Sequence, residues 1–362
     1  MNNIFITGAT GFLGWDIVKN LLGEKDSVLH VLVRAESQLA AEGRVNKLIN
    51  ERIDKEKRED ARERIKVICG DVTKKDLGIS RPQLEKLYKK IDIIYHGAAL
   101  CEFGVPLERI RKINLFGTKN MLDFALNCKN KGRLNSFQHI STIGIAGDFG
   151  GMLYEKDLNI NQGFNNTYEQ SKFEAEALVN EYRDKGLSIS VYRPSIVVGD
   201  SMTGKVSNFQ MFYQPLHIFS LELVEKIPAN KSLGYNLVPV DYAARAIHLI
   251  SSNQDNNKNY HLTNPNTVAL SSLLDVASSY FGFKKPEIIP EREYDYNKLT
   301  GFRKKVLDPY LPYFNHKKLS FDAANSDTLL KSKGFSWPAI DEDLLLRLFK
   351  YCADVRYIKR RH

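Results

Sequence analysis

The glycine-rich stretch near the start of the chain constrains the fold more than any other feature. A short apolar run at residues 4–6 ends in the turn "TGATGFLG", and a helical pattern of apolar residues follows directly. This order of strand, turn and helix is the context in which a glycine fingerprint binds a dinucleotide. Gly8 permits the tight turn, Gly11 lets the backbone approach a pyrophosphate, and Gly14 lets the helix pack against the strand. The predicted contacts in this turn are Gly8, Thr10, Gly11, Phe12, Leu13 and Gly14.

An arginine after the second predicted strand bears on the choice of dinucleotide. The apolar run that ends at Val33 is followed by Arg34, where an NAD-selective site usually carries an acidic residue for the ribose hydroxyl. A guanidinium can pair with a 2′-phosphate through two hydrogen bonds and stack on adenine. Arg44 follows on the next predicted helix. We therefore expect NADPH rather than NADH, with a solvated surface arginine as the alternative.

Further strands and helices alternate along the chain. The stretch "RIKVICGDV" is predicted as the third strand, "IDIIYHGAAL" as the fourth, "SFQHISTIGIAGD" as the fifth, ending in adjacent hydroxyls, and "LSISVYRPSIVVGD" as the sixth. Such alternation implies a parallel, doubly wound sheet of the Rossmann type, so the predicted fold class is α/β. Ligands of these sheets bind beyond the carboxyl ends of the strands. The residues expected at those ends are Asp71, Val72, Gly97, Ala98, Ala99, Ser141 and Thr142.

The chain changes character after residue 200. Residues 1–200 and 236–264 are predicted to form the NAD(P)-binding Rossmann domain, and residues 201–235 and 265–362 a smaller, mostly helical C-terminal substrate-binding domain. An irregular segment at this change collects apolar side chains that form either a small core or the lining of an apolar substrate site. They are Phe209, Met211, Phe212, Tyr213, Phe219 and Leu221. Earlier in the chain, the charged residues 36–64 predict one or two solvated helices.

A tyrosine and a lysine lie four residues apart in the stretch "YEQSK". Tyr168 and Lys172 share one face of the predicted helix, so the phenol and the ammonium can meet. A phenol, with a pKa of about 10, is a poor acid–base catalyst at neutral pH unless a nearby cation stabilises its anion. Taken alone, the spacing also fits an aromatic ring packed on the aliphatic stem of a lysine.

Composition narrows the functional classes. The chain has 362 residues, of which 43% are hydrophobic and 26% charged, and its formal net charge is +9. This charge suits an anionic ligand, and no zinc-ligand spacing or nucleic-acid module accompanies it, so we expect neither a metal site nor nucleic-acid binding. The cysteines are scattered, the first strand leaves no room for a signal peptide, and no apolar run could span a bilayer. These features favour a cytoplasmic protein.

The motifs, taken in order, resemble those of a known superfamily. The stretches "TGATGFLG", "STIGIAGD", "YEQSK" and "YRPSIVVGD" resemble an extended short-chain dehydrogenase/reductase. Within that superfamily, "LVRAES", the charged insertion, "HGAA", "NLFGT", "HIST" and "RPSIVVGDSMTG" are similar to thioester reductases and fatty acyl-CoA reductases. The similarity covers residues 1–265 well and the remainder loosely.

The resemblance implies roles for individual residues. Tyr168 would be the proton donor and Lys172 its activator and a ribose ligand. Thr142 would be the second hydroxyl at the reacting oxygen, with Ser141 beside it. Asn114 matches a helix asparagine with a structural or proton-relay role. The segment expected against the nicotinamide carboxamide comprises Pro194, Ser195, Ile196 and Val197.

The implied activity is NADPH-dependent reduction of an acyl thioester to an aldehyde, with a second reduction to the alcohol left open. Hydride attack on the carbonyl carbon places charge on its oxygen, where Thr142 and Tyr168 would act as an oxyanion hole does. The sequence also leaves open an NAD(P)-dependent dehydrogenase of a secondary alcohol or ketone, of hydroxysteroid or dihydroflavonol type. A nucleotide-sugar epimerase or dehydratase and a non-enzymatic NADPH sensor are further alternatives.

Two basic segments bear on partners. The stretch "GFRKK", with Arg303, Lys304 and Lys305, and the terminal "RYIKRRH" are candidate contacts for an anionic phosphopantetheine arm, on coenzyme A or on an acyl carrier protein. The tail "DLLLRLFKYCADVRYIKRRH" predicts an amphipathic helix that docks on the protein's own core or, as a peripheral contact, on a membrane surface. We expect a monomer or homodimer.

Overall fold

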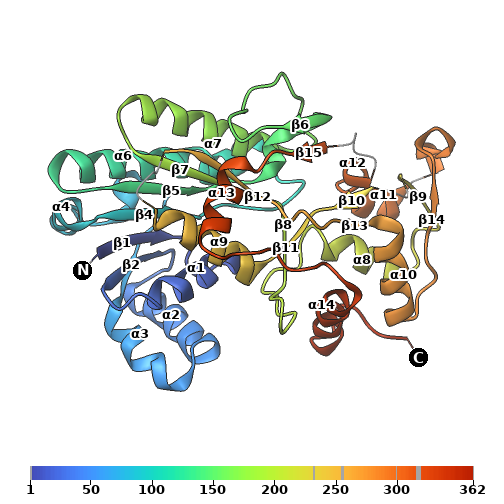
Figure 1. The fold of residues 1–362 in the computed structure, drawn as a ribbon, viewed down its shortest axis with the longest axis horizontal. Helices are drawn as coiled ribbons and strands as arrows, with labels where there is room; N and C mark the ends of the chain where they lie inside the picture. Colours follow the sequence, from blue (N-terminus) through green and yellow to red (C-terminus); the bar gives the residue numbers. More distant parts are fainter. Residues whose placement is uncertain (1, 231–232, 254–256, 299, 315–318, 362) are drawn as a thin grey trace.

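A parallel sheet organises the N-terminal part of the chain (Figure 1). The computed structural model describes residues 2–230, 233–253, 257–298, 300–314 and 319–361. The strands of the sheet are β1 (Asn2–Thr7), β2 (Ser27–Val33), β3 (Ile65–Cys69), β4 (Ile93–His96), β5 (Ser136–Ile140), β7 (Ile189–Pro194) and β12 (Asn259–Leu262). Within the described residues these seven strands pair in the order β12-β7-β5-β4-β1-β2-β3, all in parallel. The predicted α/β, doubly wound fold is confirmed.

Helices cover both faces of this sheet, above and below the strands in Figure 1. They are α1 (Phe12–Leu22), α2 (Gln38–Arg52), α3 (Arg58–Arg64), α4 (Arg81–Lys90), α5 (Leu107–Asn114), α6 (Phe116–Lys131), α7 (Thr167–Asp184) and α9 (Val240–Ser251). On one face α1 and α9 pack together and bury Trp15 and Ile247 in a shared cluster. On the other face α4, α6 and α7 enclose Phe5, Phe124 and Phe137. Apolar burial between these layers holds the α/β unit together.

The charged segment between β2 and β3 folds as its charge alternation predicts. It forms α2 and α3, joined by a short 3-10 turn at Lys55–Lys57. The hydroxyl of Ser37 caps α2 by accepting a hydrogen bond from the Ala40 amide at 3.2 Å. Most of the remaining surface of both helices is solvated.

A second core lies at the right of Figure 1. Its helices are α8 (Tyr213–Ser220), α10 (Leu270–Phe281), α11 (Gly301–Leu307), α12 (Leu311–Phe314) and α14 (Glu342–Asp354). Outside the main sheet, short strands form two-stranded pairs: β6 (Gly151–Leu153) with β15 (Leu319–Phe321), β8 (Ile196–Val198) with β11 (Leu237–Pro239), β9 (Lys226–Pro228) with β14 (Glu287–Ile289), and β10 (Gly234–Tyr235) with β13 (Val268–Ala269). One more helix, α13 (Ala324–Ser332), returns to pack on α9 and β12.

The division into two domains stays a prediction. Its ranges include residues that lie outside the described part of the chain, namely 1, 231–232, 254–256, 299, 315–318 and 362.

The apolar face of the C-terminal helix belongs to the second core. Leu345, Leu348 and Phe349 of α14 are buried there, against α10. The sequence predicted that this apolar face docks either on the protein's own core or on a membrane surface, and in the structure it packs on the core. Among the described residues, no helix has the length and apolar character needed to cross a membrane.

Two glycines are required where β1 turns into α1. Gly8 has a φ of +75°, and a Cβ there would lie 2.5 Å from the carbonyl carbon of Gly97 after β4. A Cβ on Gly14 would lie 2.1 Å from the carbonyl oxygen of Gly8. Any side chain at either position would push α1 or the β4 loop away from the turn.

We predict that Gly14→Ala lowers the free energy of unfolding by about 1–3 kcal/mol, because the added methyl overpacks this contact. The matched control is Gly43→Ala in α2, where no atom lies within 4 Å of the added Cβ. That substitution should raise stability by about 0.5–1 kcal/mol, since alanine is the better helix former. Denaturant titration measures both, and equal stability of Gly14→Ala and wild type would contradict the packing.

Candidate active site

The carboxyl ends of β1, β4, β5 and β7 open into one cavity of about 610 Å³. The predicted site residues that line it are Gly8, Gly11, Phe12, Leu13, Gly14, Gly97, Ala99, Ser141, Thr142, Tyr168, Lys172, Pro194, Ser195, Ile196 and Val197. Segments far apart in the sequence thus meet at one place, because parallel strands all end at the same edge of the sheet.

Helix α7 carries Tyr168 and Lys172 to this cavity. It begins after Asn166, whose side chain accepts a hydrogen bond from the Glu169 amide at 3.0 Å. Tyr168 is half-buried and lines the cavity. Lys172 is only 4% exposed, and its ammonium donates to the carbonyl oxygen of Ile140 at 2.8 Å. The lysine is therefore tied to the end of β5 and not to solvent.

Thr142 faces Tyr168 from the turn that follows β5. Its hydroxyl caps the 3-10 turn Ile143–Ala146 by accepting a hydrogen bond from the Gly144 amide at 3.1 Å. Because the oxygen is held as an acceptor, the hydroxyl proton remains for donation to a partner in the cavity.

Burial sets the protonation of the tyrosine and the lysine. It raises the pKa of the Tyr168 phenol well above its ordinary value; the neighbouring Cys101 thiol adds to this, and a hydrogen bond with Thr142 opposes it. Burial also lowers the pKa of Lys172, against the opposing influence of Cys101 and Glu176. At neutral pH the phenol therefore keeps its proton, as an acid for reduction must.

Asn114 and Ser141 are fully engaged by protein partners. The Asn114 side chain accepts from the Leu100 amide at 2.7 Å and donates to the Leu100 carbonyl at 3.0 Å and to Ser171 at 2.9 Å. It thereby fixes the loop after β4 to α7. The Ser141 hydroxyl donates to the Glu176 carboxylate at 2.6 Å.

Arg34, Arg44 and Thr10 gather where β2 ends, outside the cavity. The Arg44 guanidinium donates to the Arg34 carbonyl oxygen at 2.6 Å and to the Thr10 hydroxyl at 3.2 Å. Both arginines are exposed. The glycine turn and two cationic side chains thus lie together, and this arrangement fits an anionic dinucleotide.

The predicted cofactor residues Asp71, Val72 and Ala98 also lie off the cavity. Val72 is buried in the core beneath α4 and α6, and Asp71 accepts hydrogen bonds from Thr73. Ala98 packs against the same core, and its amide donates to the Thr7 hydroxyl at 3.3 Å. Their assignment to the cofactor stays a prediction. Among the described residues, no group of three or more metal-ligating side chains is found.

The sequence analysis missed several residues around Tyr168. Cys101, which follows β4, is exposed, lines the cavity and contacts the phenol. Tyr313 donates to Glu169 on α7 at 2.6 Å, and its ring stacks on that of Phe103, with centroids 5.5 Å apart. No local pattern marks these residues, because only the fold brings them to α7.

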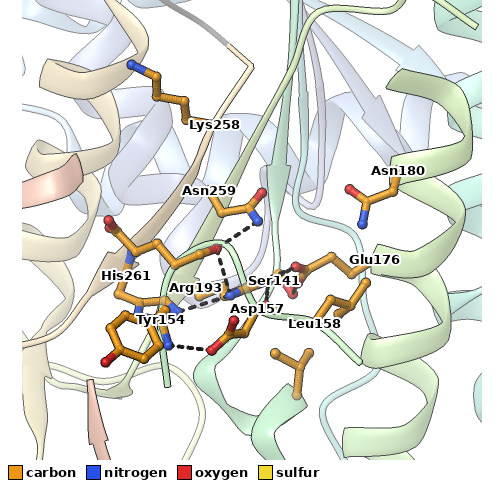
Figure 2. Close-up of polar contacts among 12 residues, drawn as sticks. Ser141, Tyr154, Asp157, Leu158, Glu176, Asn180, Arg193, Lys258, Asn259 and His261 are labelled. Carbon is orange, nitrogen blue, oxygen red and sulfur yellow. Dashed lines mark hydrogen bonds and ion pairs between the residues drawn. The ribbon is translucent and has the colours of Figure 1, made fainter. Parts of the chain in front are cut away.

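A buried ion pair behind the site was also missed. Glu176 and Arg193 are 1% and 0% exposed, and they join α7 to β7 (Figure 2). Two signals were present in the sequence. Arg193 lies in the "YRPS" motif, and Glu176 continues the four-residue spacing of Tyr168 and Lys172.

Beyond the hydroxyls, apolar side chains of the second core line the cavity. They are Phe212, Leu216, Phe219, Leu273, Leu274, Tyr310 and Phe314, and Met211 lines the cavity as well. Members of the aromatic cluster predicted from the sequence are thus found in the core and at the cavity wall, and a role in binding substrate stays a prediction. Phe212 and Phe219 line the cavity and belong to the core, whereas Phe209 and Tyr213 pack edge to face within the core.

A second cavity, of about 410 Å³, adjoins the first. The two share lining residues Cys101, Glu102, Phe103, Gln210, Met211 and Tyr310. The outer part of the second cavity lies between α8 and α11, where Leu221, Phe302 and Lys305 are exposed. The second cavity therefore lies between the cavity of Tyr168 and the surface formed by α8 and α11.

The fold and this site define an oxidoreductase of the extended short-chain dehydrogenase/reductase type. The model of the NAD-binding family described as "Male sterility protein" matches residues 6–247, and the chain belongs to this family. The resemblance to extended short-chain dehydrogenases/reductases that the order of the motifs indicated is thereby confirmed.

The curated relatives that this chain matches are much longer proteins, and the match covers only part of each. It is 33% identical over 272 residues to L-2-aminoadipate reductase of Saccharomyces cerevisiae, covering 69% of this chain and 19% of that protein. It is 29% identical over 293 residues to carboxylic acid reductase of Mycobacterium marinum, covering 73% and 24%. The chain thus spans a quarter or less of these relatives' length. The terminal R domain from the myxalamid PKS-NRPS pathway superimposes with a TM-score of 0.86 at 25% identity, covering 100% of this chain and 93% of that one.

Proposed function

We propose that this chain uses NADPH to reduce an acyl thioester to an aldehyde and a free thiol. One observation carries the proposal: the hydroxyls of Tyr168 and Thr142 lie between a glycine-lined dinucleotide turn and an apolar cavity that opens to the surface. The names of the relatives, which include a carboxylic acid reductase and a terminal R domain, support it.

The proposed chemistry uses three side chains. Bound NADPH supplies the hydride that reduces the carbonyl carbon. Thr142 and Tyr168 donate hydrogen bonds to the carbonyl oxygen and stabilise its developing charge. Tyr168 then gives its proton to that oxygen, and Lys172 stabilises the resulting phenolate. The hemithioacetal collapses to the aldehyde and thiol, and the same residues could serve a second reduction to the alcohol.

The apolar lining favours a lipidic or otherwise apolar acyl group over a sugar. A nucleotide-sugar site needs polar partners for several hydroxyls, whereas the inner wall here is formed by residues such as Leu216, Phe219 and Leu274. Reduction of a ketone in the same cavity remains the competing activity, because Thr142, Tyr168 and Lys172 serve it equally well. We place the reaction in the cytoplasm, in keeping with the four free cysteines.

The second cavity suits the arm of a carrier-bound thioester. An acyl chain would enter the buried apolar end, so the thiol arm would leave along the path between α8 and α11. Arg303 and Lys305 on α11 are exposed beside this path, and Phe302 offers an apolar contact. A phosphopantetheine phosphate and an acidic carrier protein both complement this surface.

We predict that Tyr168→Phe lowers kcat on the order of 10²- to 10⁴-fold, because the proton donor is lost. NADPH affinity, measured by fluorescence titration, should stay within about threefold of wild type, since the glycine turn is untouched. The matched control is Tyr182→Phe on the same helix, whose hydroxyl bonds Asp123 away from the cavity. Normal turnover by Tyr168→Phe would reject the proposed site.

We predict that Arg34→Asp lowers the ratio of kcat/KM for NADPH over NADH on the order of 100-fold, because a charged hydrogen bond to the 2′-phosphate is replaced by repulsion. Arg62→Asp is the control, since Arg62 lies on α3 and bonds Asn50. An unchanged cofactor ratio in Arg34→Asp would show that the arginine is only solvated.

We predict that the double change Arg303→Glu and Lys305→Glu raises KM for an acyl carrier protein by about tenfold, as expected for the loss of two exposed ion pairs of ~0.7 kcal/mol each. The KM for a short, uncharged N-acetylcysteamine thioester should not change. The control reverses Lys331 and Lys333, which are exposed in and just after α13. Equal effects on both substrates, or none on the carrier, would contradict this docking route.

A further inference from the structure

Three polar residues follow one another at four-residue spacing on the buried face of α7. Tyr168 and Lys172 have proposed roles in the reaction, and Glu176 has none so far. The Glu176 carboxylate accepts from the Ser141 hydroxyl at 2.6 Å and from Arg193 Nε at 2.9 Å, and its second contact with the guanidinium completes an ion pair. Ser141 immediately precedes Thr142. One carboxylate therefore links the catalytic helix to the strand end that carries the second hydroxyl.

Arg193 uses the rest of its guanidinium to hold other segments (Figure 2). It donates to the carbonyl oxygens of Glu155 at 3.2 Å and Asp157 at 2.7 Å. It also lies 3.1 Å from His261 Nε2 on β12. The other ring nitrogen, Nδ1, lies 2.6 Å from a carbonyl oxygen, so Nδ1 carries the proton and Nε2 accepts from the arginine.

The loop that Arg193 holds is also hydrogen-bonded to α13. The carboxylate of Glu155 accepts from the backbone amides of His261 at 2.8 Å and Asn325 at 2.6 Å, and from the Ser326 hydroxyl at 3.1 Å. The polar network thus joins β5, β7, β12, α7 and α13 directly behind the catalytic side chains.

An ion pair buried to this degree is weak support for stability, because desolvation of both charges offsets their attraction. The pair does fix the position of both side chains, because the planar guanidinium of Arg193 and the carboxylate of Glu176 make their hydrogen bonds in one relative orientation. Glu176 lies one helical turn from Lys172 and accepts a hydrogen bond from Ser141, the residue before Thr142. A constraint at this place therefore acts directly on the reacting groups.

We propose that Glu176 and Arg193 are positioning residues for Tyr168, Lys172 and Thr142: the pair locks the face of α7 to the ends of β5 and β7. This inference rests on the proposed catalytic roles of Tyr168 and Lys172. A displacement of about 1 Å between reacting groups can cost on the order of 100-fold in rate.

The charge of Glu176 has a second effect on Lys172. The titratable and charged groups around the ammonium are Tyr168 and Glu176 on α7, Cys101 after β4, His96 on β4 and His139 on β5. Burial lowers the pKa of His96 to about 3 and that of His139 well below its ordinary value, so both are neutral. Cys101 and, after it, Glu176 oppose the lowering of the Lys172 pKa by burial, and Glu176 is the carboxylate of the two.

The test is Glu176→Gln in the full chain, with turnover normalised to folded protein. We expect kcat to fall 10- to 100-fold, on the order of a 1 Å misplacement, while NADPH affinity and thioester KM stay within about threefold. Without the anion the Lys172 pKa falls, so the ammonium is lost at lower pH. The alkaline limb of the kcat–pH profile should move to lower pH.

The variant Arg193→Lys separates the effect of the ion-pair geometry from the effect of the Glu176 charge. It also provides the test if Glu176→Gln does not fold. It keeps the Glu176 anion but loses the planar fork, so kcat should fall similarly while the alkaline limb stays in place. Glu174→Gln is the control, because Glu174 lies on the same helix but pairs with Arg111 on α5. Its kcat and pH profile should match wild type.

Unchanged kcat per folded molecule in Arg193→Lys, or the same loss in Glu174→Gln, would overturn the positioning role. An alkaline limb that Glu176→Gln does not move would overturn the effect on Lys172. Full turnover by Tyr168→Phe would instead reject the catalytic assignment itself, so the two failures are distinguishable.

Discussion

Parallel pairing of the seven strands is the constraint on which the rest of the structure depends. It puts the carboxyl end of every strand at one edge, so the glycine turn after β1, the hydroxyl of Thr142 after β5 and the segment after β7 meet at one place. The second core closes over that edge and supplies the apolar wall. The glycine turn and the apolar wall therefore belong to different layers that line one cavity.

The polar groups behind this edge divide into two kinds. Thr142 and Tyr168 each have a hydroxyl proton that can be donated into the cavity. The hydrogen bonds of Asn114, Ser141 and Glu176 are made to other side chains of the protein. The second kind holds α7 in place, and α7 carries the acid. Burial keeps that acid protonated, because it raises the pKa of Tyr168. The same low-polarity surroundings would strengthen any hydrogen bond to a developing oxyanion.

Much of this was predictable from the sequence where the signal is local. The alternating strands predicted the sheet, charge alternation predicted α2 and α3, and the four-residue spacing predicted that Tyr168 and Lys172 share a helix face. Interactions that need the tertiary fold were not predictable. Cys101 reaches the phenol through the loop after β4, and Tyr313 reaches Glu169 across 144 residues of sequence. The buried partner of Arg193 could be found only once β7 and α7 were adjacent.

The most direct test of the central claim is the stoichiometry of NADPH oxidised to thiol released. It would be measured with acyl-coenzyme A, acyl-carrier and N-acetylcysteamine thioesters, beside aldehydes, ketosteroids and nucleotide sugars. The account predicts thioester-dependent NADPH oxidation with one NADPH per thiol for an aldehyde product, or two for an alcohol. Oxidation with ketones or nucleotide sugars while thioesters are inert would contradict it and make the cavity the site of a different dehydrogenase.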